Sequence, residues 1–126
     1  MIVGLGIDVC GIERIARAIE RHGERFLVRL LTPAEHAFAK TRFSDQPSYV
    51  AARLAVKEAA SKALGVPAGI GWHDVETAKA ANGAPQMLLR GRAQARAQEL
   101  NVTSHHVSIS HDAGVACAVV VLETGG

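Results

Sequence analysis

Aromatic residues, cysteines and charge of one sign are all scarce in this sequence. Only 4% of its 126 residues are aromatic, and its two cysteines, Cys10 and Cys117, lack the spacing of a zinc site. We interpret both cysteines as small buried thiols and not as a disulfide. Fourteen basic and twelve acidic residues give a formal charge of +2, which is too small a bias for a protein dedicated to nucleic-acid binding.

Long hydrophobic runs are also absent. The apolar stretch at the N-terminus is interrupted by Asp8 and follows no basic segment, so neither a signal peptide nor a membrane span is expected. We therefore expect a cytoplasmic protein that binds neither membranes nor nucleic acid. The length is typical of one domain, and we expect a single domain over residues 1–126.

Hydrophobic patterning predicts several strands and helices. Residues 2–7 are apolar and β-prone, which predicts a buried strand that delivers Asp8 at its end. Apolar spacing then predicts an amphipathic helix from about Gly11 to Leu30, and Thr32-Pro33-Ala34-Glu35 has the capping box of a second helix. The other expected elements are a long helix capped by Ser48 and ending before Gly65, strands at 74–78 and 86–89 around an Asn82-Gly83 turn, a helix at 91–100, and strands at 107–111 and 115–122.

Two acidic residues and one lysine are candidates for chemistry. Glu58 and Lys62 share a face of the long helix, where a carboxylate and an ammonium could bracket a phosphate-bound metal. The alternative is an ordinary exposed i,i+4 pair. Asp8 favours the first interpretation, because a carboxylate that follows a buried run needs a cation or several donors. Two converging acids suit magnesium, whose other ligands are then water and phosphate oxygens.

Three motifs, in this order, resemble those of the phosphopantetheinyl transferases. Gly6-Ile7-Asp8 followed by Arg14 is similar to the G-x-D-x-x-x-x-x-R opening of that family. Lys57-Glu58-Ala59-Ala60-Ser61-Lys62 resembles its K-E-A-x-x-K helix, and Ser108-Ile109-Ser110-His111 resembles the S-[IL]-S-H segment of its short acyl-carrier-protein synthase branch. The order, the separations and the total length all fit the short branch.

Three positions depart from the usual pattern of the family. Leu54 stands where an aromatic residue commonly precedes the lysine-glutamate pair, Val66-Pro67 interrupts the loop after the long helix, and Cys10-Gly11 is a less familiar continuation of the first motif. None of them coincides with an expected metal ligand. They bear on the shape of the coenzyme pocket.

The resemblance implies transfer of the 4′-phosphopantetheine arm of coenzyme A to a serine of apo-acyl carrier protein, with release of adenosine 3′,5′-bisphosphate and a requirement for magnesium. It puts Asp8 and Glu58 on the metal and Lys62 on the phosphates. The general base stays open between Glu58, His111 and a water held by Glu35. Residues expected near the coenzyme are Arg53, Lys57, Ser61, Gly65 and His111.

Several of these residues have a simpler structural interpretation. Glu35 could be only the acid of the capping box, and Gly65 could be only a helix C-cap. His111 could close a hairpin or hold a 3′-phosphate, and Arg53 and Lys57 could be solvated surface residues.

The resemblance also implies an α+β fold with an antiparallel sheet packed against the long helix. The short members of the family are trimers with active sites between subunits, so we expect a homotrimer. Five arginines against three glutamates in residues 13–30 suggest a basic surface that steers an acidic carrier protein, with Arg14 and Arg21 as candidate contacts. A solvated helix face is the alternative.

Two functions of other classes are compatible with the same residues. A magnesium-dependent phosphohydrolase of a nucleotide would use two acids and a lysine on water, and it would release free phosphopantetheine. A non-catalytic trimeric module would bind an acidic protein, with Asp8 and Glu58 only in salt bridges, and would show no turnover.

Overall fold

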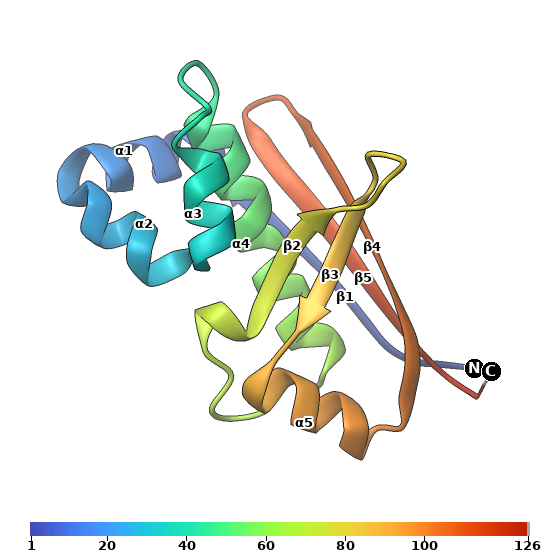
Figure 1. Ribbon diagram of the computed structural model, residues 1–126. Helices are drawn as coiled ribbons and strands as arrows, with labels where there is room; N and C mark the ends of the chain where they lie inside the picture. Colours follow the sequence, from blue (N-terminus) through green and yellow to red (C-terminus); the bar gives the residue numbers. More distant parts are fainter. Residues whose placement is uncertain (126) are drawn as a thin grey trace.

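A long helix lies against one face of a three-stranded antiparallel sheet in the computed structural model, which describes residues 1–125 (Figure 1). The strand order is β1 (Ile2–Gly11), β5 (Val115–Thr124), β4 (Val102–Asp112), and the helix is α4 (Gln46–Ala63). This confirms the expected α+β architecture. The other elements are α1 (Ile12–His22), α2 (Glu24–Leu30), α3 (Pro33–Ala39), the 3-10 turn η1 (Trp72–Asp74), the hairpin β2 (Val75–Lys79) and β3 (Pro85–Leu89), and α5 (Gly91–Glu99).

Two glycines let α4 lie directly on the backbone of β1. A Cβ atom on Gly6 would lie 1.9 Å from the carbonyl oxygen of Ala59, and one on Gly4 would lie 2.2 Å from that of Ala63. Only glycine fits at such an approach of two backbones. The closeness brings Asp8, two residues after Gly6, to the side of the helix that carries Glu58.

The prediction of a buried strand that ends at Asp8 is wrong in both respects. Strand β1 continues to Gly11, and Leu5, Ile7 and Val9 are 64%, 58% and 57% exposed. Successive side chains of a strand point to opposite faces, so only the glycines, Asp8 and Cys10 face the helix. The uncovered sheet face comprises Leu5, Ile7 and Val9 with the β5 residues paired to them, Val121, Val119 and Cys117.

The single helix predicted from Gly11 to Leu30 is two helices. Gly23, with φ +59 and ψ −137, ends α1 by donating its N–H to the Ile19 carbonyl at 2.7 Å, and α2 starts at the next residue. Glycine adopts this positive φ without the penalty that a side chain would bring. The apolar periodicity runs through the break and therefore did not reveal it.

The other helix ends follow local signals, with one correction. The capping box is confirmed, because Thr32 Oγ1 accepts from the Glu35 N–H and Glu35 Oε1 accepts from the Thr32 N–H. Ser48 is not the cap of α4, which begins at Gln46 after Asp45 and has Pro47 in its first turn, where the missing N–H of proline does no harm.

The remaining expectations need only small changes. The hairpin around Asn82-Gly83 and helix α5 are confirmed within a residue or two. Strand β4 begins at Val102, earlier than predicted, because the consecutive polar residues 103–106 give no apolar alternation to reveal it. Cys10 is buried and Cys117 half-buried, and both are free thiols. Among residues 1–125 no helix is both long and apolar enough to cross a membrane.

Candidate active site

The centre of the site is an ion pair between a strand and a helix. Lys62 Nζ, on α4, donates to Asp8 Oδ1 and to the Ile7 carbonyl of β1, both at 3.0 Å. The alternative of an exposed Glu58–Lys62 pair is therefore wrong. Within the described chain Glu58 forms no ion pair, which leaves its carboxylate available to a ligand.

Asp8 and Glu58 both lie close enough to the Cys10 thiol to affect its pKa. Burial raises the pKa of this thiol, the nearby Arg14 cation lowers it, and the carboxylates of Asp8 and Glu58 raise it further. The thiol is 2% exposed, and magnesium prefers oxygen ligands to sulfur. The remaining donors are two carboxylates from different elements, and no cluster of three acidic, histidine or cysteine side chains occurs in residues 1–125. This donor set fits magnesium, which needs only one or two carboxylates besides water and phosphate oxygens.

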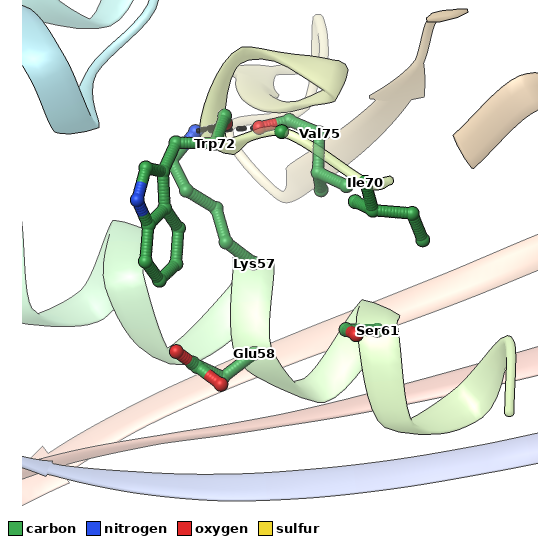
Figure 2. Close-up of a pocket in the computed structure, with 7 residues that line it drawn as sticks. Lys57, Glu58, Ser61, Ile70, Trp72 and Val75 are labelled. Atoms are coloured by element: carbon green, nitrogen blue, oxygen red, sulfur yellow. Dashed lines mark hydrogen bonds between the residues drawn. The ribbon is translucent and has the colours of Figure 1, made fainter. Parts of the chain in front are cut away.

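Glu58 lies between two cavities that share Trp72 as a wall. The smaller one, of about 110 Å³, lies between α4 and the η1 segment and is also lined by Ser61, Ile70 and Val75 (Figure 2). The larger one, of about 340 Å³, has an apolar lining from Phe26, Leu30 and Leu54, and Arg14 and Arg29 also line it. Glu58 could therefore contact two ligands at once: a phosphate-bearing group in the smaller cavity, and a protein or an apolar chain in the larger one.

Lys57, which was predicted to contact the coenzyme, lines the smaller cavity, but its ammonium is bonded inside the protein. Lys57 is 3% exposed, and its Nζ donates to Glu35 Oε1 at 2.8 Å, to the Trp72 carbonyl at 2.9 Å and to the Val75 carbonyl at 2.5 Å. Burial lowers the pKa of this ammonium, while the Glu35 carboxylate acts in the opposite direction. All three N–H donors are used inside the protein, so none remains for a phosphate.

Glu35 is equally enclosed. It is 1% exposed and accepts from Lys57 Nζ, from the Thr32 N–H and from the Thr77 N–H. Its role in the capping box is confirmed. A carboxylate surrounded by these donors and closed to solvent is not placed to hold a reactive water, so the structure argues against this option for the base.

Arg53 lies one turn before Lys57 on α4 and lines a separate cavity. Its guanidinium stacks over the Tyr49 ring at 4.1 Å, and the cavity, of about 120 Å³, is also lined by Phe38, Thr77 and Lys79. Arg53 Nε and Thr77 Oγ1 are buried there and have no partner within residues 1–125. These donors are free for a polar ligand.

Gly65 is the residue after the C-cap of α4. It has φ +85 and donates its N–H to the Lys62 carbonyl, and the next N–H, of Val66, reaches the Ser61 carbonyl at 2.8 Å. This pair of bonds is a Schellman motif, in which glycine is the usual residue. The helix-cap interpretation is confirmed, and Gly65 also opens the loop that leads to η1.

His111 is not brought next to Glu58 within one chain. The Arg42 guanidinium holds the pKa of the Asp45 carboxyl below its ordinary value, and His111 is close enough to contribute to this effect. Asp45 precedes the first turn of α4, and from there the helix rises by about 20 Å before Glu58. His111 thus lies in the neighbourhood of Asp45, and it lines neither cavity at Glu58.

The two predicted partner contacts are both on the surface of α1. Arg14 and Arg21 are exposed and border a hollow with Arg17, Ala18 and His22. Neither arginine has an ion pair in the part of the chain that the structure describes. Their charge is directed to solvent.

Trp72 was missed by the sequence reasoning. Two features of the sequence could have drawn attention to it: it is the only tryptophan of the chain, and it follows the glycine-rich loop. The importance of this residue depends on its position over Glu58, which only the folded chain reveals.

Comparisons with known proteins agree on one family. The family model described as the 4′-phosphopantetheinyl transferase superfamily matches residues 4–120. Holo-(acyl-carrier-protein) synthase of Desulfovibrio desulfuricans is 50% identical over 125 residues, covering 98% of both chains, and that of Frankia alni is 43% identical over 123 residues, again covering 98% of both.

Solved structures of the same name are also similar. The enzyme of Helicobacter pylori, in complex with coenzyme A, is 38% identical with a TM-score of 0.80 and covers 94% of this chain and 99% of that one. The enzyme of Bacillus anthracis, in complex with CoA (3′,5′-ADP), is 34% identical with a TM-score of 0.81 and covers 99% of each chain.

Proposed function

The chain belongs to the 4′-phosphopantetheinyl transferase superfamily, and from this premise we propose that it converts apo-acyl carrier protein to the holo form. It is an enzyme that transfers the 4′-phosphopantetheine group of coenzyme A to a serine hydroxyl and releases adenosine 3′,5′-bisphosphate, a step that fatty acid biosynthesis requires. The observation that carries the proposal is the ion pair of Asp8 with Lys62, one turn of α4 after Glu58, together with the position of Glu58 in the lining of two cavities. The coenzyme in the Helicobacter pylori complex supports the choice of donor substrate.

Asp8 and Glu58 would hold magnesium, which neutralises charge on the coenzyme's pyrophosphate. Lys62, whose side chain is 49% exposed, is placed to donate to the same phosphate oxygens. The serine oxygen attacks the phosphorus bound to pantetheine, the bond from that phosphorus to the bridging oxygen breaks, and the adenosine bisphosphate leaves with the bond's electron pair. Lys62 stabilises the charge that develops on the leaving oxygen.

Glu58 is the general base of this proposal, directly or through one water. Its carboxylate is partly exposed and lines both cavities, so it can reach the serine of a carrier protein in one cavity and the coenzyme in the other. His111 is the other candidate, and it would act from a neighbouring subunit. Ser61 and Arg53 are proposed coenzyme contacts, Ser61 because it shares the smaller cavity with Glu58 and Arg53 because its buried Nε has no partner.

We propose that three chains assemble through the uncovered sheet face, with active sites between subunits. The exposed side chains of Leu5, Ile7 and Val9 form a large apolar surface for a chain of this size, and such surfaces mark interfaces. Within one chain His111 lines neither cavity at Glu58, which supports a site completed by a neighbour.

Arg14 and Arg21 would contact the acidic carrier protein, because both side chains are exposed to solvent. The cytoplasm is the proposed compartment.

Mass spectrometry of apo-acyl carrier protein, incubated with this protein, coenzyme A and magnesium, tests the function. We expect a phosphopantetheine mass gain that disappears with a chelator and in Glu58→Ala. Free phosphopantetheine without modified carrier protein would indicate the phosphohydrolase. No turnover with any carrier protein would indicate the binding module, and a gain that survives Glu58→Ala would remove Glu58 from the site.

A further inference from the structure

Lys57 carries a charge inside the protein, next in sequence to the acid that lines both cavities. The side chains of Lys57 and Glu35 are 2% and 1% exposed, and their charged atoms lie 2.8 Å apart. A buried ion pair is weak evidence for stability, because removing two charges from water costs as much as their attraction returns. An additional role for this pair is therefore worth considering.

The other two contacts of the ammonium indicate that role. They are the carbonyls of Trp72 and Val75, which lie at the start of η1 and the start of β2. These carbonyls bracket the segment that returns from the end of α4 to its middle. The Lys57 side chain thus joins residues 72–75 to α4 through these two hydrogen bonds.

The fastened segment forms the walls of the site. Trp72 and Val75 line the smaller cavity with Glu58, and Trp72 also lines the larger one. Figure 2 shows the indole of Trp72 and the carboxylate of Glu58 on the same side of α4, with the Lys57 side chain running between the helix and the segment. The segment has other bonds as well: the Gly71 N–H donates to Asp74 Oδ2, Arg92 Nε donates to the Ala68 carbonyl, and His73 Nε2 donates to the Val28 carbonyl of α2 at 3.0 Å, but none of these joins it to α4.

We propose that Lys57, whose side chain is part of the lining of the smaller cavity, is a positioning residue that holds Trp72 over α4 and so gives the coenzyme cavity its shape. The part of this inference that concerns the coenzyme rests on the proposed function. The part that concerns Trp72 does not, because its position can be measured without any substrate.

The test uses a double variant that leaves no unpaired charge in the interior. Lys57→Met with Glu35→Gln removes both charges and the bonds from Lys57 Nζ to the Trp72 and Val75 carbonyls, at similar side-chain volume. Lys40→Met, on an exposed lysine outside the site, is the matched control. Because Trp72 is the only tryptophan, its emission maximum and its quenching by acrylamide report on the segment directly.

We expect the double variant to unfold cooperatively, with a red-shifted emission and at least twofold stronger quenching than the control. The Michaelis constant for coenzyme A should rise about tenfold, corresponding to about 1.4 kcal/mol, while that for carrier protein stays within about twofold. Emission and quenching equal to the control would overturn the proposal, and so would loss of cooperative unfolding, because Lys57 would then serve the whole fold. Changed fluorescence with no transferase activity in the unmodified protein would reject the proposed function and retain the positioning role.

Discussion

Lys62 Nζ lies 3.0 Å from Asp8 Oδ1, although 54 positions separate the two residues in the chain. The pair joins β1 to α4 at the place where the two backbones approach most closely. Both side chains remain partly exposed, at 49% and 20%, so the ion pair can open to admit a ligand. Partly exposed pairs contribute about 0–1 kcal/mol to stability, so we attribute the placement of these charges to function.

Asp8→Asn should separate stability from activity. The amide keeps the size of the side chain, and we expect the free energy of unfolding to change by less than about 1 kcal/mol. Transfer should fall at least about a hundredfold, because one of two carboxylates proposed for magnesium is lost. Chemical denaturation and the carrier-protein assay at several magnesium concentrations measure the two quantities. Full activity at low magnesium would exclude Asp8 as a ligand.

Gly6→Ala should be severely destabilising. The added Cβ would meet the Ala59 carbonyl at 1.9 Å, and this atom belongs to a helix backbone that cannot move independently. Overpacking of this kind costs about 1–3 kcal/mol or more. Gly11→Ala is the control on the same strand, because its Cβ would meet only the Arg14 Cβ at 3.9 Å. Equal melting temperatures for the two variants would show that the strand and helix are not packed as described.

Local signals explain which parts of this structure the sequence predicts. The capping box at Thr32 and Glu35 and the Asn82-Gly83 turn involve residues within a few positions of each other, and both were recognised. The break at Gly23 was not, because the apolar spacing continues across it and a single glycine is tolerated in many helices. The structure pairs Asp8 with Lys62, but the sequence argument for Asp8 rested on the wrong premise of a buried strand.

Long-range contacts account for the features that sequence reasoning missed. A lysine beside a glutamate on a helix resembles a solvated pair, and nothing near Lys57 in sequence indicates that its partners are Glu35 and two carbonyls 15 and 18 residues later. His111 was matched to a family motif, but in a single chain it lines neither cavity at Glu58. Its proposed role depends on the assembly of several subunits, which neither the sequence motif nor the structure of one chain describes.

Ile7→Glu should convert the proposed trimer to a folded monomer. The Ile7 side chain is 58% exposed in one chain, so a charge there costs little until subunits associate. Buried in an apolar interface, the same charge would be unpaired and strongly unfavourable. Light scattering should give a monomer mass with an unchanged circular dichroism spectrum, and transfer should be lost. Gln98→Glu, on exposed α5, is the control, and a fully active monomer would contradict a site shared between subunits.

His105 should make the protein less stable in mild acid. Burial lowers the pKa of this side chain below the ordinary histidine value of 6.5, and the neighbouring His106 lowers it further. The unfolded chain therefore binds the proton more readily, so stability is complete above about pH 6.5 and declines as pH falls toward the lowered value. Urea unfolding at about pH 7.5 and about pH 5.5 should show a smaller difference for His105→Gln than for the unmodified protein. His22→Gln, on exposed α1, should leave the difference unchanged.

Arg14→Glu should impair the carrier protein and spare the coenzyme. Arg14 is exposed on α1, has no ion pair in residues 1–125, and also lines the larger cavity next to Glu58. Reversing its charge opposes an acidic partner, and we expect the Michaelis constant for carrier protein to rise about tenfold while that for coenzyme A stays within about twofold. Added salt should raise the constant less steeply in the variant than in the unmodified protein, because screening then removes less attraction. Arg21→Glu should behave in the same way if both arginines belong to one docking surface. Equal increases for both substrates would instead place Arg14 in the catalytic site and leave the docking surface to be found elsewhere.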